Sequence, residues 1–167
     1  MNDGGIMHID SPECRYLASA DPLLGRAMHL VGDFEYNAHT NTEDFFFSTI
    51  IGQMMSNTVA DVIEDRVSAM CGGKMTADTI IGLGVDCIRS AGVSTQKAEY
   101  MTLFAQKVKA EPQFLNELAE KSNSEVVKEL TALRGIGNWT AKMYLLFVLK
   151  RNDILPSEDG AFLQAYR

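Results

Sequence analysis

The chain has 167 residues, of which 46% are hydrophobic, and carries a formal net charge of −7 at neutral pH. This length and composition suit one domain, or two small lobes around one core, and exclude a disordered or low-complexity chain. No apolar run reaches the about 18 residues that a membrane helix requires, so we expect no membrane association.

The cysteines and the N-terminus bear on the cellular compartment. Cys14, Cys71 and Cys87 are odd in number and form no Cys-x-x-Cys pair. This usage predicts reduced thiols and neither a disulfide framework nor a zinc site. Residues 1–10 have no basic segment ahead of an apolar one, so no signal peptide is predicted and the protein is expected to be cytoplasmic.

The charge is unevenly distributed along the chain. Residues 134–167 contain five basic and three acidic residues, so the rest of the chain carries −9. Proteins that bind nucleic acid through its phosphates are usually basic. The acidic body therefore argues against such a partner, and only the C-terminal fifth favours one.

Apolar residues at helical spacing, with capping residues ahead of them, predict an all-α chain without sustained strand alternation. Gly72 and Gly73 are expected to end one of these helices. The predicted helices cover residues 42–55, 57–71, 77–83, 86–91 and 95–108, with others beginning near Pro112, after Ser122–Ser124 and at the end of the Gly135-x-Gly137 turn.

The turn at residues 133–137 joins two of these helices into a tight hairpin. Gly135 and Gly137 permit left-handed backbone or close approach. They also leave the N–H groups at the start of the second helix free to meet a phosphate. By itself a Gly-x-Gly turn is weak support, because an ordinary helix connection accounts for it equally well.

Segments at residues 47–57, 88–100, 133–141 and 153–160, taken in this order, resemble those of the helix-hairpin-helix base-excision DNA glycosylases, with the 3-methyladenine DNA glycosylase II group as the nearest branch. The segment Leu133-Arg134-Gly135-Ile136-Gly137-Asn138-Trp139-Thr140-Ala141 resembles the hairpin that names the family. Residues 153–160 resemble its proline-containing segment that ends in an aspartate. Residues 47–57 resemble its wedge helix, and residues 88–100 resemble its middle helices.

The resemblance covers most of residues 20–167 and implies a single two-lobed glycosylase domain over residues 1–167. The first lobe would comprise about residues 1–40 plus the C-terminal end. The second would comprise about residues 41–150, with the hairpin at 133–137. Relatives usually continue well beyond the aspartate, so the C-terminus is expected to be truncated relative to the family.

The resemblance assigns the catalytic role to Asp159. Breaking an N-glycosidic bond places positive charge on the sugar, and a carboxylate can stabilise that charge and activate water. Asp159 could instead cap a helix beginning at Gly160, and both roles can hold together. Glu158 is a weaker candidate for the same chemistry.

Trp139 occupies the position at which strand-cleaving relatives carry a nucleophilic lysine. We therefore expect hydrolysis without abasic-site lyase activity, and Lys142 is a poor substitute nucleophile. Trp139, Met143 and Tyr144 are expected to form the base pocket, with Met143 where the branch usually has a second aromatic. A tryptophan packed in the core is the alternative.

The remaining site assignments also follow from the resemblance. Gln53 and Met54 would fill the gap left by an extruded nucleotide, although Met54 could equally be a core residue. The residues expected to bind the DNA backbone are Arg134, Gly135, Gly137 and Thr140. The main-chain carbonyls of Thr131, Leu133 and Ile136 would hold a monovalent cation, Na⁺ or K⁺. No other cofactor is expected, and three scattered cysteines cannot supply a four-cysteine iron–sulfur cluster.

The sequence thus predicts a monomeric, monofunctional glycosylase that releases alkylated, 3-methyladenine-like bases from double-stranded DNA. It would be associated with the nucleoid, or nuclear in a eukaryote. Three alternatives stay open at this point. They are a glycosylase for mismatched or oxidised bases, a non-catalytic helix-hairpin-helix DNA-binding module, and a protein-interaction bundle, which the charge of −7 favours.

Overall fold

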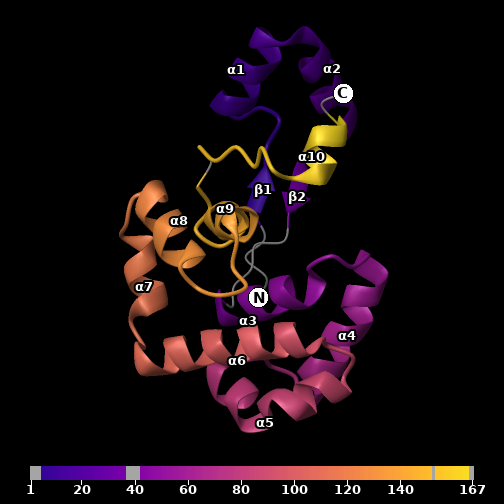
Figure 1. Ribbon diagram of the computed structural model, residues 1–167. Helices are drawn as coiled ribbons and strands as arrows, with labels where there is room; N and C mark the ends of the chain where they lie inside the picture. The colour runs from indigo at the N-terminus through magenta and orange to yellow at the C-terminus, as the bar shows by residue number, and fades with distance from the viewer. Residues whose placement is uncertain (1–4, 37–41, 152, 166–167) are drawn as a thin grey trace. The chain divides into compact units, whose positions relative to one another are not determined.

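In a computed structural model, the described residues, 5–36, 42–151 and 153–165, form ten helices and one pair of short strands (Figure 1). The prediction of an all-α fold is confirmed. Contacts divide the chain into two units, Met1–Thr40 and Asn41–Arg167. The C-terminal helix, which the resemblance assigned to the first lobe, is grouped with the second unit. No helix within the described ranges is long and apolar enough to cross a bilayer.

The first unit contains the strands, which the sequence analysis did not predict. Strand β1 (Gly5–Met7) pairs antiparallel with β2 (Phe34–Tyr36), and helices α1 (Pro12–Ala20) and α2 (Pro22–Val31) lie between them in the chain. Strands of three residues are too short for alternation to be visible in a sequence. Each helix begins at a proline after a capping side chain, an arrangement that fixes both starts.

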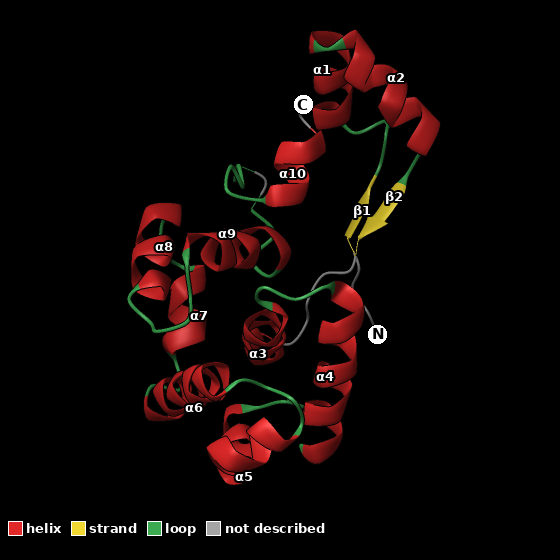
Figure 2. Cartoon of the chain, turned by 45° about the vertical axis from the view of Figure 1, so that its right-hand side comes forward, coloured by secondary structure: helices red, strands yellow, loops and turns green. Residues whose placement is uncertain are grey.

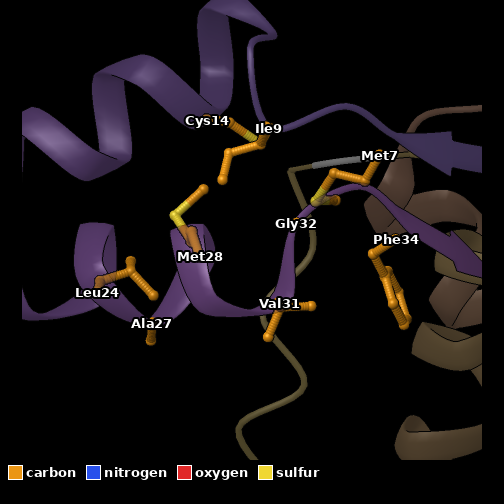
Figure 3. A pocket seen from close by; sticks show the side chains of 9 residues that line it. All are labelled: Met7, Ile9, Cys14, Leu24, Ala27, Met28, Val31, Gly32 and Phe34. Carbon is orange, nitrogen blue, oxygen red and sulfur yellow. The ribbon is translucent and has the colours of Figure 1, made fainter.

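The first unit has little core of its own. Helices α1 and α2 approach closely at Gly25, where a Cβ atom would lie 3.0 Å from the carbonyl oxygen of Ala18. Apolar side chains from both strands and both helices line a pocket of about 250 Å³ (Figure 3). Several other apolar side chains of this unit, Leu23 and Leu30 among them, are exposed.

The second unit is built around one apolar helix. Its elements are α3 (Thr42–Gly52), α4 (Asn57–Met70), α5 (Ala77–Ser90), α6 (Thr95–Ala110), α7 (Phe114–Ala119), α8 (Asn123–Thr131), α9 (Asn138–Phe147) and α10 (Gly160–Ala165). Figure 2 shows α3 nearly end-on, with α4, α6 and α9 around it, and contacts between α3 and each of these helices agree. A helix that is apolar on most sides is expected to lie in such a central position.

The caps predicted from the sequence begin several of these helices. The Ser94 hydroxyl accepts from the N–H of Lys97 at the start of α6. Ser122 and Glu125 form a capping box at the start of α8, in which each side chain accepts from the other residue's N–H. Local hydrogen bonding thus sets these boundaries.

Three predicted helix boundaries differ from the structure. Helix α3 ends at Gly52 and does not reach Met55, because Met54 has a left-handed φ of 57°. The two helices predicted over 77–91 form one element, with a kink at Gly84 (φ 73°, ψ 165°). Helix α7 begins at Phe114, two residues after the expected proline.

An aromatic cluster connects α3 to the helices on either side. The ring centroid of Phe46 lies 4.6 Å from that of Phe104 on α6 and 5.0 Å from that of Tyr144 on α9. Burial raises the pKa of Tyr144 to about 12. The cluster fixes α9, the helix that carries Trp139, against the core.

We predict that Phe46→Ala lowers the free energy of unfolding by about 3–5 kcal/mol, because a fully buried ring and its contacts with Phe104 and Tyr144 are lost. Urea denaturation monitored by circular dichroism measures the change. Leu103→Ala is the matched control, since Leu103 lies on α6 with 45% of its surface exposed. Similar losses in the two variants would contradict the central role of α3.

Candidate active site and nucleic-acid interface

A hydrogen bond joins the two residues to which the sequence analysis gave most weight. Trp139, the second residue of α9, donates from Nε1 to Oδ2 of Asp159 over 2.8 Å. The other carboxylate oxygen, Oδ1, accepts from the N–H of Phe162 at 2.7 Å and so caps α10. The capping role is confirmed, and the carboxylate is oriented by an indole and a helix start at once.

This pair lies beside an open cavity of about 650 Å³. Its walls come from the end of α3, the start of α4, the start of α9 and the segment before α10. The residues that line it are Thr49, Gly52, Gln53, Met54, Asn57, Ala60, Gly137, Trp139, Thr140, Glu158, Asp159 and Gly160. The charged residues in this set are both acids. The volume lies within the range of small-molecule sites, and the charge favours a cationic or neutral occupant.

Trp139 is placed to face this cavity, whereas Met143 and Tyr144 are not. Trp139 is 39% exposed, which excludes the alternative of a tryptophan packed in the core. Met143 and Tyr144 are both buried core residues outside the cavity lining, so their assignment to the pocket is corrected. Tyr144 lies about 140° around the helix from Trp139. Met143 lies one turn deeper, where α9 has entered the core.

The turn between α3 and α4 presents Met54 to solvent. Its side chain is fully exposed, so the alternative that it belongs to the core is wrong. Its φ of 57° is uncommon for a residue with a side chain, and the neighbouring contacts must hold it there. Gln53, next to it, donates from Nε2 to the main-chain oxygen of Gly135 over 2.7 Å.

The two glycines of the hairpin have different structural roles. Gly135 has a φ of 86°, and a Cβ atom there would lie 2.4 Å from the ring of Tyr100 on α6. Gly137 is the N-cap of α9, has an unstrained φ of −99°, and has nothing within 4 Å of a Cβ position. Gly135 is therefore required by packing, whereas Gly137 leaves the start of α9 open.

The other residues expected to contact the DNA backbone, Arg134 and Thr140, differ in their exposure to solvent. Arg134 is exposed on the hairpin turn. Thr140, by contrast, is buried and forms part of the cavity wall. Thr140 therefore differs from Arg134 in exposure, and its assignment to the backbone contact stays a prediction.

An ion pair lies next to the Trp139–Asp159 hydrogen bond. Lys142, one turn after Trp139 on α9, donates from Nζ to Oε2 of Glu158 at 2.7 Å. This hydrogen bond lowers the pKa of the Glu158 carboxyl. Two adjacent contacts therefore hold the segment before α10 on the exposed side of α9. Lys142 and Glu158 are thus engaged with each other, and Lys142 is not among the residues that line the cavity.

The carbonyls assigned to a monovalent cation belong to the end of α8 and the hairpin turn. The oxygen of Leu133 accepts from the N–H of Ile136 at 3.2 Å, which leaves it a second lone pair. Main-chain oxygens are suitable ligands for a hard cation. The residues present fit such an ion, and the assignment stays a prediction.

Sequence reasoning missed several residues that build the site. Thr49, Asn57 and Ala60 also line the cavity, from α3 and α4, and although the first two lie in the segment that resembles the wedge helix, nothing in the sequence singled them out. Lys97 on α6 donates from Nζ to the main-chain oxygens of Ile51 and Gln53, at 2.8 and 2.6 Å. Lys97 lies in the segment 88–100 that resembles the middle helices of the family, but the sequence gives no sign of its main-chain partners.

The chain has recognisable relatives, although no family model matches it. It is 27% identical over 158 residues to DNA-3-methyladenine glycosylase 1 of Schizosaccharomyces pombe, covering 91% of this chain and 69% of that protein. It is 33% identical over 129 residues to the DNA-3-methyladenine glycosylase of Saccharomyces cerevisiae, covering 70% of this chain and 44% of that protein. A crystal structure of a DNA-3-methyladenine glycosidase from Bacillus halodurans matches with a TM-score of 0.81 and 29% identity, covering 93% of this chain and 72% of that one.

The helical fold, the hairpin and the capped aspartate are the features of a helix-hairpin-helix DNA glycosylase, and the relatives named above are DNA-3-methyladenine glycosylases. The chain belongs to the helix-hairpin-helix DNA glycosylase family. Within it, the chain lies near the 3-methyladenine DNA glycosylase II group. It spans less than half the length of the Saccharomyces cerevisiae relative.

We predict that the two hairpin glycines respond differently to alanine. Gly135→Ala should lower the free energy of unfolding by about 2–4 kcal/mol, through the left-handed backbone and the clash with Tyr100. Gly137→Ala should change it by less than about 0.5 kcal/mol, because its Cβ would point into open space. Thermal denaturation of the two variants side by side makes the comparison. An equal effect would show that the hairpin is not packed against α6 in this way.

Proposed function

We propose that this protein is a hydrolytic DNA glycosylase that releases alkylated, 3-methyladenine-like bases from duplex DNA and leaves an abasic site. The observation that carries the proposal is the hydrogen bond between Trp139 and Asp159 at the wall of the cavity. It places an aromatic surface and a carboxylate side by side, the two groups that such a reaction uses at the base and at the sugar.

The character of the cavity supports an alkylated purine as the substrate. N-alkylated purines carry positive charge, and an indole face attracts a cation. The Asp159 carboxylate in the lining favours the same charge, whereas the charge of Glu158 is already balanced by Lys142. A positively charged base is already an activated leaving group, so no general acid has to protonate it. The absence of a lysine or histidine from the described lining residues is compatible with this chemistry.

Asp159 supports the step at the sugar. As the glycosidic bond breaks, its electron pair leaves with the base, and positive charge develops on the sugar. The Asp159 carboxylate stabilises that charge and orients a water molecule, whose oxygen bonds to the anomeric carbon and whose proton is released to the carboxylate or to solvent. The donors at Trp139 and Phe162 fix the carboxylate before the substrate arrives.

The remaining contacts serve DNA binding. A base can enter the cavity only after its nucleotide rotates out of the duplex, and Met54, which is exposed, would fill the vacated space. The open start of α9 and the exposed Arg134 would bind a phosphate, and the carbonyls of Thr131, Leu133 and Ile136 would hold a monovalent cation nearby. No strand cleavage is expected, since Trp139 replaces the lysine and Lys142 is paired with Glu158.

We predict that Asp159→Asn reduces the release of methylated bases from duplex DNA at least about 100-fold, because the charge that stabilises the sugar is lost. An asparagine can still cap α10 through its carbonyl oxygen, so the fold should persist. Asp153→Asn makes the same chemical change in the same segment and should leave release unchanged. Equal release by wild type and Asp159→Asn would remove the catalytic role of Asp159.

Base release and DNA binding, measured on the same duplexes, separate the alternatives. Release of oxidised or mismatched bases, and not of alkylated ones, would change the substrate and keep the reaction. DNA binding without any release would favour a non-catalytic module. No DNA binding at low salt would favour a protein-interaction bundle.

We predict that Met54→Ala weakens binding to a duplex containing an abasic site about tenfold, by removing the side chain that fills the gap. Stability should not change, because the Met54 side chain is fully exposed in the free protein. Fluorescence anisotropy measures the affinity. Met70→Ala, at the far end of α4, is the control for the same chemical change. A variant with wild-type affinity would show that Met54 is not the wedge.

A further inference from the structure

Lys97 binds the end of α3 through main-chain oxygens. Its ammonium group donates to the main-chain oxygens of Ile51 and Gln53. These oxygens belong to the last turn of α3 and to the residue after it, where carbonyls lack partners within the helix. The negative end of the helix dipole lies there as well, so a cation is favoured at this place.

No carboxylate accompanies this charge in the described part of the chain. Every described lysine ion pair involves Lys107, Lys109, Lys121 or Lys142, and none involves Lys97. The side chain is half-buried, and burial lowers its pKa. The ammonium has lost part of its hydration, and the two carbonyls at the helix end are the contacts that offset this loss. Its presence therefore points to a positional role.

Lys97 is also one element of a closed set of contacts. Gln53, whose oxygen Lys97 binds, donates from its side chain to the oxygen of Gly135. Gly135 packs against Tyr100, which lies three residues after Lys97 and thus on the same face of α6. One turn of α6 therefore contacts both the segment that carries Met54 and the hairpin.

We infer that Lys97 is a positioning residue that holds the wedge loop, residues 53–56, at a fixed distance from the hairpin. In this role Met54 enters the duplex at the nucleotide whose phosphate the hairpin binds. The inference rests on the proposed function. It accounts for the left-handed backbone of Met54, which persists only where surrounding contacts determine it.

The first test uses the free protein and needs no DNA. The N–H of Met55 donates to the oxygen of Gly52 across the wedge loop. In Lys97→Met, amide hydrogen exchange at Met55 should accelerate about tenfold, as loss of charged hydrogen bonds loosens the loop. Lys109→Met, with the same charge change on α6 at an exposed ion pair, should not alter it. Unchanged exchange in Lys97→Met would overturn the inference.

The second test asks whether Lys97 acts through Met54. Affinity for a duplex containing a tetrahydrofuran abasic site is measured for wild type, Lys97→Met, Met54→Ala and the double variant. Lys97→Met should bind about tenfold more weakly in the wild-type background and lose nothing further in the Met54→Ala background. Equal losses in both backgrounds would show that Lys97 contributes only general stability or charge, and would also overturn the inference.

Two controls keep the result interpretable. Lys97→Gln can still donate to one carbonyl and should give intermediate values, and it replaces Lys97→Met if the latter does not fold. Base release from methylated duplex DNA is measured separately on wild type. Its absence would count against the proposed function, whereas exchange at Met55 and abasic-site binding would still decide the role of Lys97.

Discussion

Gly135 is where three elements of the second unit constrain one another. Its φ of 86° and the ring of Tyr100 leave no space for a side chain, and its carbonyl accepts a hydrogen bond from Gln53. The hairpin can therefore lie flat on α6 only with glycine at this position. Because the Gln53 side chain of the wedge loop binds the same carbonyl, the two turns proposed to contact DNA are fixed to each other at one point.

The cavity depends on this anchor and on the aromatic core beneath it. Phe46 on α3 packs against Tyr144 on α9, so the central helix determines where α9 begins. The first turn of α9 then presents Trp139, to which the segment before α10 returns through Asp159. The groups proposed for chemistry thus reside on helix ends that the core holds in place, and such placement suits a site that must be organised before it binds.

Local features of the site were predictable from the sequence, whereas its long-range contacts were not. The starts of α6 and α8 follow from Ser94 and Ser122, and the cap formed by Asp159 follows from the residues next to it. The apolar periodicity predicted that α3 continues to Met55, whereas the helix ends at Gly52 and the apolar Met54 lies exposed in the turn that follows. The same periodicity could not tell that Met143 and Tyr144 turn into the core.

The contacts of Lys97 show why long-range contacts could not be predicted from the sequence. Its partners are main-chain oxygens 44 and 46 residues away, and any sequence supplies such oxygens. Only the packing of α6 on α3 brings them within reach. The strands of the first unit were missed for a related reason, since three residues carry too little pattern for a period to be read.

The double use of Trp139 restricts how selectivity could diverge within such a site. Its ring lines the cavity while its N–H binds the Asp159 carboxylate, so under the proposed function a substitution that admits a different lesion would also disturb the group assigned to catalysis. Thr49, Asn57 and Ala60 line the cavity from α3 and α4, which are separate from the segment that carries Asp159. Under the proposed function, the α3–α4 wall is where a substitution could change the range of lesions without touching Asp159 or Trp139, and a laboratory evolution experiment on this scaffold would begin there.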